Sequence, residues 1–77
     1  MDAMDQRSSI TNERVGEDLD ISHSMVSRIR SGDRTPSLGV MLKMHEDWGW
    51  PLEEQALARA LGKYAEEFEA QLVKRYG

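Results

Sequence analysis

A chain of 77 residues is long enough for one small domain, and the absence of cysteine means that no disulfide stabilises it. Ten basic residues against 14 acidic ones give a net charge of −4, which on its own argues against a nucleic-acid-binding protein. No apolar run exceeds three residues, far short of the roughly 20 that cross a bilayer, so we expect no membrane segment.

The charges are distributed unevenly along the chain. Residues 22–34 contain three arginines, Arg28, Arg30 and Arg34, and one acid, Asp33, whereas most acids lie elsewhere. A local basic segment on an acidic chain is typical of a small regulator that binds DNA and stays soluble. The distribution of the charges therefore favours DNA binding, although the net charge does not.

Two short helices are predicted at the beginning of the chain. Residues 1–9 form the first and end in paired serines. Thr11 is a good N-cap for the second, over residues 12–19, where apolar side chains lie four positions apart. Gly16 allows a close approach of a neighbouring backbone, and Asp20 is compatible with a tight turn.

A third helix is predicted from the cap Ser22 to about Ser31, with Val26 and Ile29 on its buried side and Gly32 at its end. A loop over residues 32–36 follows. Ser37 caps a fourth helix, in which four side chains share a face: Leu38, Met41, Leu42 and His45.

The last predicted helix begins at Pro51, whose missing N–H breaks no hydrogen bond at the first helical position. Spacings of four, three, four and four place five apolar residues on one stripe of a helix of up to 25 residues: Leu57, Leu61, Tyr64, Phe68 and Leu72. Gly62 interrupts this stripe. Glycine costs about 0.8–1.0 kcal/mol against alanine inside a helix, so a kink or a break into two helices is the alternative.

Two short helices joined by a tight turn, the second with polar side chains on its outer face, are the parts of a helix-turn-helix. Ten residues at unbroken spacing carry a more specific pattern: Thr11, Val15, Leu19, Ile21, Ser22, Val26, Ser27, Ile29, Gly32 and Pro36. This pattern resembles the Cro/cI-type helix-turn-helix family of phage and bacterial repressors.

The resemblance implies an all-α fold of five or six helices. It assigns a DNA-binding domain to residues 1–50 and a helical extension, which packs on the core or dimerises, to residues 51–77. The implied activity is transcriptional regulation by binding double-stranded operator DNA in the cytoplasm of a bacterial cell. The small size favours a phage Cro-type repressor that excludes polymerase. The rival class is a protein-interaction module such as an antitoxin or an anti-repressor.

Four outward-facing side chains of the third helix are the candidates for reading base edges in the major groove: His23, Ser24, Ser27 and Arg28. By resemblance, four others contact phosphates: Asn12, Ser22, Ser31 and Arg34. Asn12 takes the place where the family usually has glutamine. The alternatives are that Ser22 only caps its helix and that Arg34 is an ordinary loop charge.

The family tends to have a basic residue at the position of Asp5 and an acid at the position of Arg30. Both signs are exchanged here, which predicts an ion pair between Asp5 and Arg30 with reversed partners. The alternative is that Arg30 reaches a DNA phosphate.

Other chemistries have little support. His23 and Ser27 lie one turn apart without a carboxylate to orient the histidine, and three consecutive residues, 45–47, cannot face one metal ion from a helix. We therefore expect no enzymatic activity, metal, cofactor or small-molecule ligand.

A homodimer is the second expected partnership. Tyr64, Phe68 and Leu72 would pair with a second copy and place two reading helices about 34 Å apart. The alternative is that the chain bends at Gly62 and the last helix folds back over Trp48 and Trp50.

Overall fold

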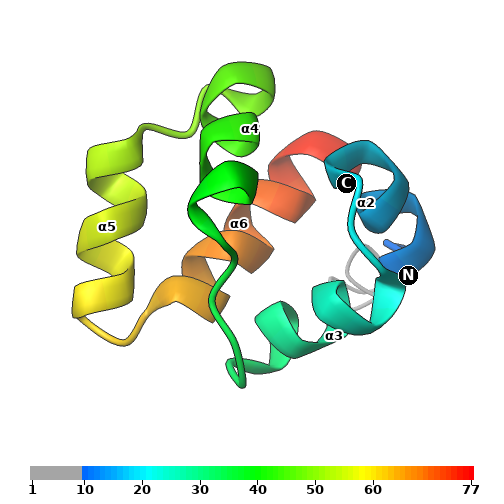
Figure 1. Cartoon of the computed structure of the whole chain (residues 1–77), viewed down its shortest axis with the longest axis horizontal. Coiled ribbons are helices and arrows are strands. Elements are labelled where there is room, and N and C mark those ends of the chain that lie inside the picture. The colour runs from blue at the N-terminus through cyan, green and yellow to red at the C-terminus, as the bar shows by residue number, and fades with distance from the viewer. Residues whose placement is uncertain (1–9) are drawn as a thin grey trace.

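The computed structural model describes residues 10–77 and contains five α-helices and no strand within that range. The helices are α2 (Asn12–Leu19), α3 (His23–Ser31), α4 (Leu38–Trp48), α5 (Leu52–Ala60) and α6 (Tyr64–Tyr76) (Figure 1). The predicted all-α class is confirmed. The helix predicted over residues 1–9 lies outside the described residues.

Three helices begin at the hydroxyl-bearing caps that the sequence predicts. The side-chain oxygens of Thr11, Ser22 and Ser37 each accept a hydrogen bond from the backbone N–H three residues further on, at 3.2, 3.1 and 3.4 Å. Each bond satisfies one of the N–H groups that a helix start leaves without an intrahelical partner. The predicted beginnings of α2, α3 and α4 are therefore confirmed.

The turn between α2 and α3 depends on two residues. Asp20 adopts the left-handed conformation with φ 57°, which Asp tolerates better than most residues do. A Cβ on Gly16 would lie 2.6 Å from the backbone oxygen of Ile21. Only glycine therefore allows α2 to approach the chain entering α3 this closely, as predicted.

The prediction of a single C-terminal helix of up to 25 residues is wrong. The structure shows the alternative, a break into two helices at Gly62. The helix α5 ends at Ala60, the chain turns at Gly62 with φ +71°, and α6 begins at Tyr64. A positive φ carries no steric penalty at glycine, so the break falls there. Pro51 precedes α5 as its N-cap residue instead of being its first residue.

The last helix folds back over the two tryptophans. Trp48 stacks on Phe68 with ring centroids 6.3 Å apart, and Trp50 lies 5.1 Å from the ring of Tyr64. Tyr64, Phe68 and Leu72 are buried in the same core as the helix-turn-helix residues. The prediction that these three side chains pair with a second copy is therefore wrong, because the chain's own core already covers them.

The buried side of α4 also differs from the predicted one. Met41 and Met44 are 5% and 0% exposed, whereas Leu38 and Leu42 are 66% and 40% exposed, and His45 is exposed too. Apolar residues occupy more than half of the circumference of this helix, so spacing alone did not identify the side that faces the core.

A buried polar network, which the sequence pattern did not reveal, joins three helices and a loop. Gln55 in α5 is fully buried, and its amide nitrogen donates to the backbone oxygens of Met41 at 2.9 Å and Trp50 at 3.1 Å. Its oxygen accepts from the Tyr64 hydroxyl at 2.8 Å. Burial raises the pKa of Tyr64 above its ordinary value of 10.0, so the hydroxyl stays protonated as a donor.

Candidate nucleic-acid interface

The helix α3 has one buried and one polar side. Val26 and Ile29 are 0% exposed and belong to the core, together with Val15 and Leu19 of α2. The four candidates for base reading, His23, Ser24, Ser27 and Arg28, are all exposed. At about 100° per residue they lie within an arc of about 140° on one side of the helix. The structure therefore brings the four together on one solvent-facing surface.

This polar surface rests on a rigid base. Val26 and Ile29 belong to the core, and α3 contacts both α2 and α6. Figure 1 shows α3 at the lower edge of the molecule, with α6 crossing the centre of the view above it. An element held from two sides keeps its outward side chains in fixed positions, as a reading helix requires.

An open hollow of about 530 Å³ lies where the start of α2 meets α3. Seven residues line it: Ile10, Thr11, Asn12, Glu13, Ser27, Arg30 and Ser31. The hollow brings the predicted phosphate contacts Asn12 and Ser31 together with the predicted reader Ser27. The first N–H groups of α2 add partial positive charge at this place, which favours an anion.

The remaining predicted phosphate contacts are distributed over both ends of α3. Ser22 lies at its beginning, where the hydroxyl oxygen caps the helix. Ser31 lies at its end, and its hydroxyl donates to the backbone oxygen of Arg28 at 3.0 Å. The Arg34 backbone N–H donates to the same oxygen at 3.3 Å, and the Arg34 side chain is exposed in the following loop.

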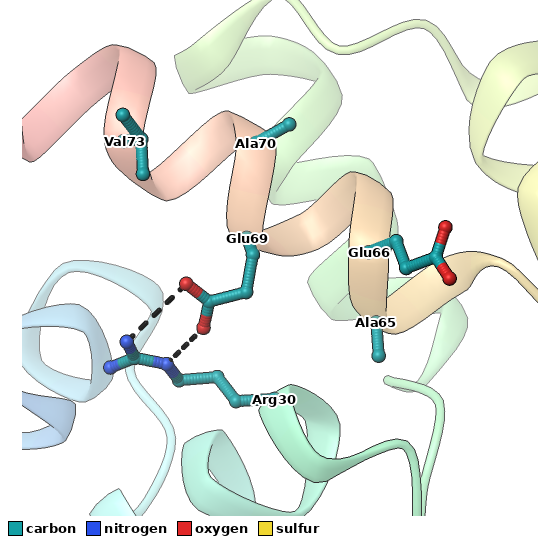
Figure 2. Close-up of a pocket in the computed structure, with 6 residues that line it drawn as sticks. All are labelled: Arg30, Ala65, Glu66, Glu69, Ala70 and Val73. Carbon is teal, nitrogen blue, oxygen red and sulfur yellow. Dashed lines mark hydrogen bonds and ion pairs between the residues drawn. The ribbon is translucent and has the colours of Figure 1, made fainter. Parts of the chain in front are cut away.

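Arg30 does not share the outer face of α3. Its Nε donates to the carboxylate of Glu69 in α6, and its Nη2 lies 3.4 Å from the other Glu69 oxygen (Figure 2). Its Nη1 donates to Asn12 Oδ1 and to the Ile10 carbonyl, both at 2.8 Å. Asp5, the predicted partner, lies outside the described residues. The guanidinium thus points toward α2 and α6, and Arg28 and Arg34 are the arginines exposed beside the polar surface.

Sequence reasoning missed Glu69 as a part of this site. It follows Phe68, one position beside the buried stripe, and its side chain is only 13% exposed. No local signal could have found it, because Glu67 flanks Phe68 in the same way and is exposed, and the partner of Glu69 is 39 residues away.

Carboxylates surround the beginning of α3. A hollow of about 380 Å³ beside Ser22 and His23 is lined by three acids of the preceding helix and turn: Glu13, Glu17 and Asp20. Because like charges repel, these carboxylates disfavour a phosphate at this end of α3. The interface is therefore mixed in sign, with acids at the start of α3 and exposed arginines at its end.

The last turn of α6 is attached to α2 and α4. The Tyr76 hydroxyl donates to the Asp18 carboxylate, and the Arg14 guanidinium lies 5.1 Å from the centre of the Tyr76 ring. Arg75 lies over Trp48 at 5.4 Å. Burial, and then the hydrogen bond to Asp18, raise the pKa of Tyr76 above its ordinary value of 10.0. We call these five residues the C-terminal clasp.

Residues 10–77 contain neither a group of side chains arranged to bind a metal ion nor a helix that could span a membrane. No group of three or more histidine, aspartate or glutamate side chains in this range is arranged to hold a metal ion. The helices of the same range are too short or too polar to span a bilayer.

Comparison with known families gives one match. A family model described as helix-turn-helix matches residues 4–47, which is more than half of the chain and includes α2, α3 and nearly all of α4. Neither the curated proteins nor the solved structures give a match.

Proposed function

We propose that this chain, which belongs to the Cro/cI-type helix-turn-helix family of DNA-binding transcription regulators, is a phage Cro-type repressor. It would act in the cytoplasm of a bacterial cell by occupying operator DNA and excluding polymerase. The observation that carries the proposal is the single polar surface of α3, where His23, Ser24, Ser27 and Arg28 are exposed together above a buried apolar side.

The four side chains suit the major groove, which admits one α-helix. Arg28 can donate two hydrogen bonds to a guanine, while His23 and the two serines can donate to or accept from neighbouring base edges. Asn12 and the free N–H groups at the start of α2 would hold one phosphate beside the hollow, and Arg34 would hold another beyond the end of α3.

The proposal predicts modest, salt-sensitive affinity. Two exposed arginines, Arg28 and Arg34, lie at the proposed interface. Each phosphate charge that is neutralised contributes about −0.9 to the slope of log affinity against log salt. If both arginines neutralise a phosphate, they contribute about −1.8 for one chain. The acids near His23 lower the affinity further.

Selection of bound sequences from random double-stranded DNA, followed by fluorescence anisotropy, tests the proposal. We expect Arg28→Ala to cost about 1–3 kcal/mol and to relax the preference at one base pair. Arg59→Ala is the matched control, since Arg59 is an exposed arginine of α5, which lies apart from α3 in Figure 1. Enrichment of no sequence, together with capture of a protein partner, would favour an antitoxin or anti-repressor instead.

We also propose that two copies bind one palindromic site through α5. Among the described residues, four large apolar side chains are exposed: Leu38, Leu42, Leu57 and Leu61. Leu57 of α5 and Leu61, the C-cap residue that follows this helix, lie one turn apart on the same side. An antiparallel pair of α5 helices about a two-fold axis would cover these leucines of both copies.

Sedimentation of the protein with operator DNA decides between one and two copies per site. We expect two copies for the unchanged chain and one for Leu57→Lys combined with Leu61→Lys. Leu38→Lys, a change at an equally exposed leucine of α4, is the control and should leave the stoichiometry unchanged. One copy per site in the unchanged chain would contradict the dimer without affecting DNA binding itself.

A further inference from the structure

Arg30 connects α6 to the start of α2. Its Nη1 donates to Asn12 Oδ1 at 2.8 Å, and its Nε donates to the Glu69 carboxylate. Figure 2 shows the Arg30 side chain extending from α3 to Glu69 across a groove lined by Ala65, Ala70 and Val73. The series of hydrogen bonds from Glu69 through Arg30 to Asn12 therefore ends in the hollow where a phosphate is proposed to bind.

The chemistry of the guanidinium determines how the Asn12 amide is oriented. Arginine has N–H donors and no acceptor, so the amide oxygen, and not the amide nitrogen, must face Arg30. The NH2 group of Asn12 is then the part of the amide that is turned away from Arg30. A phosphodiester accepts hydrogen bonds and donates none, so only this orientation offers it a donor.

Glu69 determines where the guanidinium lies. The side chains of Arg30 and Glu69 are 18% and 13% exposed, so the charges attract each other with less screening than a surface pair has. The two carboxylate oxygens face Nε and Nη2, which fixes the plane of the guanidinium and leaves Nη1 directed at Asn12. Glu69 belongs to α6, outside the matched residues 4–47.

We infer that Arg30 and Glu69 are positioning residues that set the Asn12 amide for its phosphate contact. The inference rests on the proposed function, since it explains how the Asn12 contact of the proposed DNA interface is positioned. It gives α6 a role in DNA affinity although α6 contributes none of the proposed DNA contacts.

Glu69→Gln provides a sharp test because electrostatics and positioning predict opposite results. Removal of a negative charge by itself strengthens binding to a polyanion. Loss of the oriented Asn12 contact weakens operator binding by about two- to tenfold, the range for one hydrogen bond. Glu66→Gln is the matched control, because Glu66 lines the same groove and points away from Arg30 in Figure 2.

Two further readouts separate positioning from a general loss of structure. In the Asn12→Ala background, Glu69→Gln should change operator affinity by less than about twofold, since the contact that it orients is already gone. The slope of log affinity against log salt should be unchanged. A slope steeper by about 0.9 would show that the released Arg30 binds a phosphate itself, and would overturn the inference.

The Asn12 side-chain NH2 signals in the 15N–1H spectrum of the free protein supply a readout without DNA. We expect Glu69→Gln to shift them and Glu66→Gln to leave them in place. Unmoved signals, tighter operator binding, or an equal loss in the Asn12→Ala background would each overturn the inference. If the signals shift while the unchanged chain selects no DNA sequence, the positioning stands and the proposed function fails.

Discussion

Trp48 of α4 and Phe68 of α6 stack with their rings inclined by only 25°, so the last helix closes the core that α2 and α3 share with it. Phe68 is fully buried, and the residues around it come from both the helix-turn-helix and the C-terminal segment. The stability of the reading unit therefore depends on a residue outside the family match.

Replacement of Phe68 should destabilise the whole chain, because its ring lies in the core that both parts of the chain share. We expect Phe68→Ala to lower the free energy of unfolding by about 3–5 kcal/mol, because the change leaves a cavity in the shared core. Leu38→Ala, at a side chain 66% exposed, should stay within about 0.5 kcal/mol. Urea unfolding followed by circular dichroism measures both. A stable Phe68→Ala monomer would contradict the core assignment.

The buried amide of Gln55 provides the second prediction. We expect Gln55→Leu to destabilise the fold by about 1–3 kcal/mol, because it leaves the buried Tyr64 hydroxyl without its acceptor. Adding Tyr64→Phe to this change should recover part of the loss, since the orphaned hydroxyl is then removed. Thermal unfolding of the two single variants and the double variant measures the coupling. Strictly additive losses would show that the bond contributes nothing.

Alkaline pH should destabilise the chain. The pKa values of Tyr64 and Tyr76 are raised in the folded state, so the unfolded chain loses these protons first as the pH rises. The stabilisation is complete below pH 10, the ordinary tyrosine pKa, and is lost as the pH rises through the higher folded values. Urea midpoints at several pH values from about 8 to 12 measure the loss. Tyr76→Phe should make the urea midpoint less dependent on pH. A midpoint of the unchanged chain that stays constant over this range would contradict the prediction.

The acids at the beginning of α3 should weaken DNA binding. We expect Glu17→Gln to raise operator affinity by about twofold, since one charge at about 8 Å in water contributes roughly 0.5 kcal/mol. Glu46→Gln removes the same charge from an exposed position of α4 and serves as the control. Fluorescence anisotropy at low salt measures the difference, which should shrink as salt is added. Equal gains from both variants would indicate a net-charge effect only.

The features that the sequence predicted correctly are local ones. Caps such as Thr11 and Ser22, and the close approach at Gly16, depend on residues within a few positions of one another, so short patterns contain the necessary information. The exposure of His23 and Arg28 followed in the same way from the buried positions of Val26 and Ile29.

The features that the sequence did not predict depend on distant segments. The partner of Arg30 is 39 positions away, and no local pattern distinguishes Glu69 from the exposed acids of α6. The stripe from Leu57 to Leu72 looked continuous because a chain that turns at one glycine can keep the apolar spacing on both sides of the turn. Whether it meets a second copy or its own core is decided by tertiary packing.

The C-terminal clasp has a consequence for the order in which the protein acquires function. Tyr76 reaches Asp18 across 58 positions, so this contact between α6 and α2 cannot form until the last turn of α6 has been synthesised. Closing so long a loop is also entropically unfavourable and comes late in folding. A nascent chain that ends before residue 76 therefore has all of the proposed reading residues of α3 but lacks this contact between α6 and α2.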